Sequence, residues 1–262
     1  MTFFEPVPQF PSDFHGTEIM RPVFYHDYTS IQVLFLTPIE KVRAFLPSRR
    51  LHPMRLAPRS AVTVISVIEH RDSGVGPYNL ALIGFPVTVD REAPILRGLL
   101  KAVTGGAGVF VWQMPENSRL PIQSGIETVG YPKFMAKVEL EKEDGWMVGR
   151  VEEDGQHILS LSVRSLTTQK VDRRFPGDLY VHRDPWIRRV PFVTNIKQVG
   201  TSMKRGDARL DLGDHPIADE LRQLELGRAI NVQYSPESQQ ILGSVLDGWK
   251  ADRTLHRWRP DD

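Results

Sequence analysis

One lysine in this 262-residue chain stands in a setting that could support chemistry. Lys133 follows Tyr131 and Pro132 and comes directly before an alternating stretch typical of a β-strand. A lysine amine that loses its proton attacks carbonyl carbon, and burial or a neighbouring cation promotes that loss. Because a free lysine has a pKa of about 10.4, activation near neutral pH requires a decrease of about 3 units, or ~4 kcal/mol. Lys133 is our candidate nucleophile, and a structural lysine at a strand start is the alternative.

Four other side chains are candidates for roles beside the lysine. Glu127 lies on a predicted helix just before it and could orient the amine or carry protons, although a solvated helix glutamate fits the pattern equally well. Tyr78 could donate a hydrogen bond to a substrate oxygen, or could be a core tyrosine. His70 lies at a predicted strand end near a turn, and Trp112 is a candidate for a cavity wall or for the core.

Composition narrows the class of protein. The net charge is +1, with basic and acidic residues interspersed, so there is no electrostatic case for nucleic acid as a partner. The absence of cysteine excludes disulfides, thiolate metal sites and cysteine nucleophiles, and the eight histidines show no metal-binding spacing. We therefore expect no metal and no cofactor. Without a signal peptide or an apolar run of ~20 residues, the sequence predicts a cytoplasmic protein with no membrane partner.

Hydrophobic periodicity predicts a chain made mostly of strands. The predicted strands cover residues 23–26, 30–37, 61–68, 78–89, 108–112, 136–141, 146–151, 158–166, 179–181, 190–192, 209–212 and 229–234. The predicted helices cover residues 37–46, 95–103, 120–129, 216–224 and 235–246. The three strands from 136 to 166 form a meander with Asp-Gly turns.

These elements predict a single, mainly β domain over residues 1–262, in the form of a closed or cone-like antiparallel β-barrel with a few peripheral helices. Residues 1–22 are expected to form an arm across the body or a partner subunit, or a partly disordered leader, and residues 250–262 a basic tail. In the first helix, Thr37 is the predicted cap and Pro38 the first helical residue. Gly125 in a helix interior costs about 1 kcal/mol relative to Ala unless something packs closely there.

The lysine segment resembles the acetoacetate decarboxylase family. The pattern Gly125-x-Glu127-x-x-Gly130-Tyr131-Pro132-Lys133, followed by an alternating strand, matches the family segment in which an aromatic-Pro-Lys step carries the Schiff-base amine. The predicted helix at residues 37–47 and the pattern His70-x-x-Ser73-Gly74-x-Gly76-x-Tyr78 fall in family order. The resemblance covers about residues 23–166, and it implies a small carbonyl substrate and a homo-oligomer.

The chain also departs from the decarboxylases that it resembles. Phe134 stands where they carry a second lysine, so cationic activation from the adjacent residue is absent. By the resemblance, Tyr28 and Leu80 replace the arginine and the glutamate that handle the substrate carboxylate. Burial must then lower the pKa of Lys133, and the aromatic and apolar residues expected to provide it are Tyr131, Phe134, Met135, Trp112 and Tyr78.

Together these features predict a Schiff-base lyase that acts on a keto acid or a related carbonyl compound, by decarboxylation or by aldol or dehydration chemistry. Lys133 and Glu127 are the predicted catalytic residues. The predicted substrate-binding residues are Tyr78, Tyr131, Trp112, Tyr28, Leu80 and His70. The alternative is a non-catalytic barrel that binds a small apolar ligand and retains Lys133 as a remnant.

Overall fold

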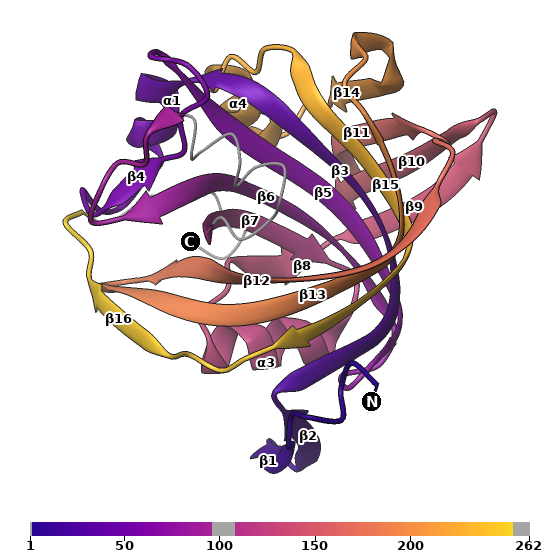
Figure 1. Ribbon diagram of the computed structural model, residues 1–262. Helices are drawn as coiled ribbons and strands as arrows, with labels where there is room; N and C mark the ends of the chain where they lie inside the picture. Colours follow the sequence, from indigo (N-terminus) through magenta and orange to yellow (C-terminus); the bar gives the residue numbers. More distant parts are fainter. Residues whose placement is uncertain (1, 96–107, 254–262) are drawn as a thin grey trace.

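The predicted closed barrel is confirmed by a computed structural model, which describes residues 2–95 and 108–253 (Figure 1). Seven strands close into a ring in the order β6-β5-β3-β15-β13-β12-β7, because β7 pairs back onto β6. Every pairing in the ring is antiparallel except that of β7 with β12, which is parallel. The seven strands are β3 (Val23–Pro38), β5 (Ser60–Ser73), β6 (Tyr78–Val89), β7 (Gly108–Glu116), β12 (Gln169–Arg183), β13 (Trp186–Ser202) and β15 (Ala229–Leu242).

Short strands extend the barrel, and a second sheet packs beside it. Strand β4 (Leu51–Pro53) pairs with β6, β16 (Asp247–Lys250) with β13, and β8 (Lys133–Met135) runs parallel to the end of β7. The second sheet contains the predicted meander and one further strand, β14. Its members are β9 (Lys137–Glu143), β10 (Trp146–Glu153), β11 (Gln156–Arg164) and β14 (Ala208–Leu212).

The helices follow the prediction in part. In the described part of the chain they are α1 (Ile39–Ala44), α3 (Arg119–Thr128), α4 (Pro216–Gln223) and the short 3₁₀ helix η1 (Arg205–Asp207). The start of α4 is as predicted, since Nδ1 of His215 accepts a hydrogen bond from the amide of Ile217 at 3.1 Å. The predicted cap of α1 is wrong: Thr37 still belongs to β3, and its hydroxyl lies 2.7 Å from that of Thr63 instead of capping the helix.

Two further predictions are corrected. Residues 235–246 do not form a helix, because β15 continues to Leu242 between β3 and β13, and this pairing on both edges outweighs the Ser-Pro helix-start signal. Pro236 fits in the strand because it lies at a register shift between Ser235 and Ser238, where a ladder hydrogen bond is not required. The helix predicted at residues 95–103 lies, from residue 96 onward, outside the described residues.

The strands predicted at residues 23–26 and 30–37 are one strand, β3, whose pairing is locally irregular. Its pairing with β5 shifts register twice between Tyr25 and Tyr28. In a regular strand these two side chains would point to opposite faces, because they are three positions apart. The shifts bring both onto the same face, where both rings contact that of His70, at 4.5 and 5.3 Å.

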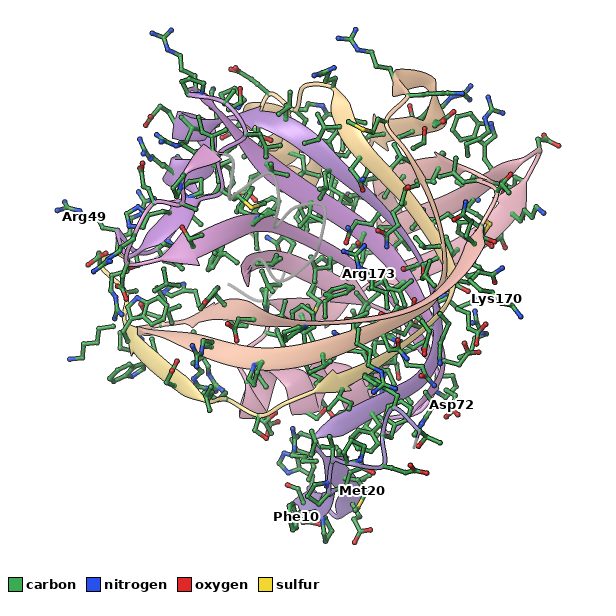
Figure 2. All side chains as sticks on the ribbon, viewed as in Figure 1. Phe10, Met20, Arg49, Asp72, Lys170 and Arg173 are labelled. Carbon is green, nitrogen blue, oxygen red and sulfur yellow. The ribbon has the colours of Figure 1, made fainter. Side chains whose placement is uncertain are left out.

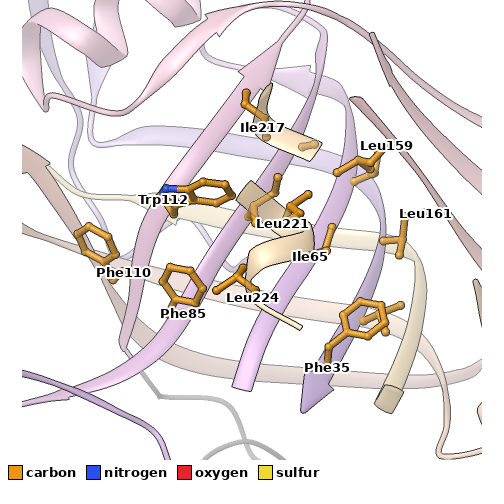
Figure 3. Close-up of a cluster of buried hydrophobic side chains, with 14 of the residues drawn as sticks. Phe35, Ile65, Phe85, Phe110, Trp112, Leu159, Leu161, Ile217, Leu221 and Leu224 are labelled. Atoms are coloured by element: carbon orange, nitrogen blue, oxygen red, sulfur yellow. The ribbon is translucent and has the colours of Figure 1, made fainter. Parts of the chain in front are cut away.

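One face of the barrel strands is covered by the four-stranded sheet, α1 and α4. Figure 3 shows Leu221 of α4, Leu224 directly after this helix and Leu161 of β11 in one cluster with Ile65 and Phe85 of the barrel. Because these elements pack on the outer face, the opposite face is turned toward the barrel interior. That inner face carries a separate cluster with members from β3, β6, β7, β12 and β13, among them Tyr25, Tyr28, Tyr78, Val111, Val181 and Val190.

The N-terminal residues form a small hairpin of β1 (Phe10–Phe14) and β2 (Thr17–Arg21) at one end of the barrel (Figure 2). Phe14 and Ile19 are buried in the inner cluster, whereas Phe10 is 66% exposed. The hairpin therefore closes over that end of the interior. Among the described residues, no helix has the length and apolar character needed to cross a membrane.

Candidate active site

Lys133 lies where the two parallel strands β7 and β8 begin to pair. Its backbone is opposite Met114, and the amide of Met114 donates to the carbonyl of Pro132 at 3.0 Å. Gly130, with φ of 93°, makes the turn out of α3 that sends the chain to this position, a conformation that favours glycine. The lysine side chain is buried, with 6% of its surface exposed. The predicted nucleophile thus extends inward from a fixed strand rather than from a surface loop.

Helix α3 provides the groove in which the lysine side chain lies. The amine donates a hydrogen bond to the carbonyl oxygen of Pro121 at 2.9 Å. A Cβ added to Gly125 would lie 2.8 Å from Cε of Lys133 and 2.9 Å from both Cδ and Nζ. Only glycine leaves room for the lysine at this distance, which explains why a glycine is present in the middle of the helix.

A buried carboxylate meets the amine from β7. Glu116 is fully buried, and Nζ of Lys133 lies 3.1 Å from its Oε1 and 3.0 Å from its Oε2. Burial raises the pKa of Glu116 to about 7, although the lysine opposes this shift. Burial likewise lowers the pKa of Lys133, against the effect of the carboxylate. Because the two pKa values move toward each other, the proton is shared more evenly between the two groups than it would be in water.

Aromatic rings enclose the pair on the inner face of the barrel. Nζ of Lys133 lies 5.5 Å from the ring centroid of Tyr131 and 5.8 Å from that of Tyr78. The ring of His70 lies 4.7 Å from that of Tyr78 and also contacts Tyr25. Burial is the main cause that lowers the pKa of His70 to about 3, and the nearby cations Lys133 and Arg71 add to it. The imidazole is therefore neutral at neutral pH.

Five of the six predicted substrate-binding residues come together on this face. Tyr78, Tyr131 and His70 surround the lysine as described above. Tyr28 contacts the ring of His70, and Leu80 is the register partner of Glu116 on the neighbouring strand. The sixth, Trp112, faces the outer cluster, where its ring centroid is 5.2 Å from that of Phe45.

The aromatic and apolar residues that were predicted to bury the amine of Lys133 do so only in part. Phe134 packs against the outer cluster, because neighbours in a strand point to opposite faces and Lys133 points inward. Met135 is 46% exposed. Tyr78 and Tyr131 are therefore the two members of that predicted set that desolvate the amine, and Glu116 and α3 provide the rest.

Glu127 is not brought to the lysine. Its side chain is 49% exposed, and its carboxylate lies 2.8 Å from Nε2 of His15 in the N-terminal hairpin. The reason is helical geometry: Gly125 faces Lys133, and a residue two positions later is rotated by about 200° around the helix axis. Glu127 ties the hairpin to α3, and the carboxylate that takes the position predicted for it is Glu116.

Two arginines from the β12–β13 hairpin fix the C-terminal end of α3. Arg183 donates to the carbonyls of Ile126 and Glu127, each at 2.9 Å, and Arg188 donates to that of Val129 at 3.0 Å. Cations at this end of a helix satisfy unpaired carbonyls and interact favourably with the helix dipole. The groove that holds Lys133 is thereby kept in place by the β12–β13 hairpin.

Glu116 and Tyr25 are the important residues that the sequence did not single out. Residues 108–112 were predicted as a strand that ended at Trp112, whereas β7 runs on to Glu116. Glu116 is the one charged residue of this mostly apolar stretch, and this was the available signal. Tyr25 lacked any comparable signal, because its direction depends on the irregular pairing of β3 with β5.

A cavity of about 480 Å³ lies elsewhere, beside α1. Its lining includes Arg43, Leu51, His52 and Asp252, and none of the residues that surround Lys133. Arg43 is engaged there with Glu92 at 2.8 Å. The convergence of titratable groups, rather than this cavity, identifies the candidate site.

Comparisons with known proteins agree with the fold of this chain. The family model described as acetoacetate decarboxylase (ADC) matches residues 6–248. The fold is similar to that of acetoacetate decarboxylase from Legionella pneumophila subsp. pneumophila str. Philadelphia 1, with TM-score 0.64, 16% identity, and coverage of 87% of this chain and 88% of that chain. No curated protein sequence matches the chain significantly.

Two further solved structures share the fold. The enduracididine biosynthesis enzyme MppR, complexed with pyruvate, has TM-score 0.58 and 14% identity, and the match covers 87% of this chain and 89% of that chain. An acetoacetate decarboxylase-like enzyme from Sphingomonas wittichii RW1 has TM-score 0.53 and 14% identity, with coverage of 86% and 92%. Identities this low indicate a shared fold alone.

The groove at Gly125 gives a first testable prediction. Alanine in a helix interior is ordinarily more stable than glycine by about 1 kcal/mol. Here Gly125→Ala is expected to lower the free energy of unfolding, because the new methyl group displaces the lysine from Glu116. In the Lys133→Ala background the same substitution should raise it. Urea unfolding of the four proteins of this double-mutant cycle measures both effects, and equal stabilisation in both backgrounds would contradict the close packing.

The buried carboxyl predicts a pH dependence of stability. The folded chain holds the proton of Glu116 up to about pH 7, whereas the unfolded chain releases it near the ordinary value of 4.5. Between pH 4.5 and about pH 7 the folded state therefore binds more protons than the unfolded state. The stabilisation that comes from the protonated carboxyl is complete below pH 4.5 and is lost as the pH rises through about 7. We expect wild type to lose up to about 3 kcal/mol relative to Glu116→Gln over this range. Urea unfolding at several pH values measures the difference, and a constant difference would rule the shift out.

Proposed function

Because the chain belongs to the acetoacetate decarboxylase family, we propose that it is a Schiff-base lyase whose nucleophile is the amine of Lys133. One observation carries this proposal. The amine is buried, and it is held 3.0–3.1 Å from a carboxyl group whose pKa is raised to about 7. A surface lysine would have no such partner and no reason to lose its proton.

The chemistry follows from the pair. With the proton on Glu116, the neutral amine of Lys133 attacks the carbonyl carbon of the substrate. Glu116 returns the proton to the departing hydroxyl, water leaves, and a cationic imine remains. This group accepts the electron pair of a neighbouring carbon–carbon bond as it breaks, and the resulting enamine takes up a proton. Hydrolysis of the imine then restores the free lysine.

The substrate class is a small carbonyl compound, either a keto acid or a related ketone or aldehyde. MppR was solved with pyruvate, which is consistent with a keto acid in this fold. The reaction on this chain is proposed as decarboxylation or as an aldol or dehydration reaction, since each uses the same imine as its electron acceptor. The homo-oligomer and the cytoplasmic location stay predictions.

The second candidate is a non-catalytic barrel that binds a small apolar ligand. The observation in its favour is the inner face itself, where aliphatic side chains such as Leu179, Val181 and Val190 adjoin the tyrosines. In that case the amine would be buried for structural reasons and would form no covalent adduct. Chemical trapping separates the two candidates.

Borohydride reduction in the presence of acetone, pyruvate or acetoacetate provides this test. We expect a stable adduct on the peptide that contains Lys133, detected by mass spectrometry, and its loss in Lys133→Met. Lys137→Met is the matched control, because Lys137 is exposed and pairs with Glu139 at 2.9 Å. An adduct that persists in Lys133→Met would refute the assignment, and no adduct with any of the three compounds would favour the binding protein.

The two glutamates give a further prediction. Glu116→Gln should lower the rate of adduct formation by about 10²-fold or more, because the proton acceptor and donor is lost. Glu127→Gln should change it less than about twofold, since that carboxylate contacts His15 rather than the amine. Single-turnover trapping rates measure both, and a larger effect at Glu127 would return it to the catalytic role predicted from the sequence.

A further inference from the structure

Three tyrosine hydroxyls and Glu116 meet on the inner face of the barrel. Tyr78 donates a hydrogen bond to the hydroxyl oxygen of Tyr25 at 3.2 Å, and the two groups are buried. Tyr131 is 3% exposed, and its hydroxyl has no hydrogen-bond partner within the described part of the chain. The amine of Lys133, which contacts Glu116, lies 5.5 Å from the ring centroid of Tyr131 and 5.8 Å from that of Tyr78, so the four groups surround the same point.

The three hydroxyls come from separate elements. Tyr25 is turned inward by the irregularity of β3, Tyr78 begins β6, and Tyr131 precedes β8. A buried hydroxyl without a partner is destabilising, because it has lost its hydrogen bonds to water. A ligand oxygen that accepted from it would recover this free energy, so the arrangement favours a ligand with an oxygen atom at this point.

The hydroxyl hydrogens that can be donated to a ligand oxygen are those of Tyr25 and Tyr131. The oxygen of Tyr25 already accepts from Tyr78, which leaves its own hydrogen free for another acceptor. Burial raises the pKa of Tyr25 to about 12 and that of Tyr131 well above its ordinary value. Both hydroxyls therefore stay neutral and act as donors. The adjacent carboxylate of Glu116, when it is ionised, repels an anion.

We propose that the hydroxyls of Tyr25 and Tyr131 form a subsite for a second, uncharged oxygen of the substrate, which selects β-hydroxy ketones and β-diketones over β-keto acids. This subsite rests on the proposed function, because the first carbonyl group must bind to Lys133. It specifies which member of the broad carbonyl class fits the site.

The reaction with a β-hydroxy ketone balances without a co-reactant. The amine of Lys133 and the ketone form the cationic imine and release water. The bond between the α and β carbons breaks, its electron pair forms the enamine, and the hydroxyl proton passes to Glu116. The β carbon leaves as a carbonyl compound, whose oxygen accepts from Tyr25 and Tyr131. The enamine carbon takes the proton from Glu116, and water hydrolyses the imine to the second carbonyl compound.

Acetylacetone is a direct probe of this subsite. It condenses with a neutral lysine amine to give an enaminone, which absorbs in the near ultraviolet and retains one uncharged oxygen. We expect wild type to bind acetylacetone more tightly than acetoacetate. Each affinity is measured by how strongly the compound inhibits the borohydride trapping of acetone on Lys133. Tyr25→Phe and Tyr131→Phe should each weaken acetylacetone binding by about 3- to 10-fold, as expected for one lost hydrogen bond. Acetone lacks a second oxygen and is the reference compound, so in both variants the loss should be larger for acetylacetone than for acetone.

Tyr180→Phe is the matched control, because Tyr180 is a buried barrel tyrosine that packs toward Trp249 on the outer face, with ring centroids 5.9 Å apart. It should leave the binding of all three compounds unchanged. If both test variants bind acetylacetone as wild type does, while acetone is still trapped, the subsite is overturned and the proposed function stands.

The comparison in wild type requires no variant to fold. Tighter binding of acetoacetate than of acetylacetone would overturn the preference for an uncharged oxygen, even if both compounds form adducts on Lys133. Failure of all three compounds to form an adduct would overturn the nucleophile itself, and the subsite with it.

Discussion

The buried contact between Lys133 and Glu116 is the interaction on which the rest of the site depends. Each group alone would be strongly destabilising in this interior, because the loss of hydration of an isolated charge costs several kcal/mol. Together they share one proton at a separation of 3.0–3.1 Å. The parallel pairing of β7 with β8 brings them together, since it fixes Met114 beside the lysine and Glu116 two positions further along.

Three departures from regular backbone structure build the surroundings of this pair. The register shifts in β3 turn Tyr25 and Tyr28 to one face. Gly125 opens α3 to the lysine side chain, and Gly130 makes the turn that ends the helix. Neither the register shifts nor Gly125 strengthens its own element. Each exchanges local regularity for the placement of a side chain, as expected at a functional site rather than in a structural core.

The parts of this arrangement that depend on local sequence were predictable. The meander and the start of α4 at His215 follow from patterns within a few residues. The partners of the lysine were not predictable in this way. Glu116 is 17 residues away in sequence and reaches the amine through strand pairing. Trp112 and Glu127 were predicted on the wrong side of their elements. The bulged register of β7 decides the side on which Trp112 lies. The rotation of α3 about its axis decides the side on which Glu127 lies.

Activation of the amine without a second cation follows from where the neighbouring side chains point. Phe134 is adjacent in sequence but packs on the outer face, so the groups that act on Nζ come from other elements. Burial destabilises the charged lysine and the charged glutamate alike, so it favours the state in which both are neutral over the ion pair. That neutral state combines a nucleophilic amine with an acid that can protonate a leaving hydroxyl. In the proposed mechanism, the same desolvation that favours the neutral amine of Lys133 also holds on Glu116 the proton that the next step requires.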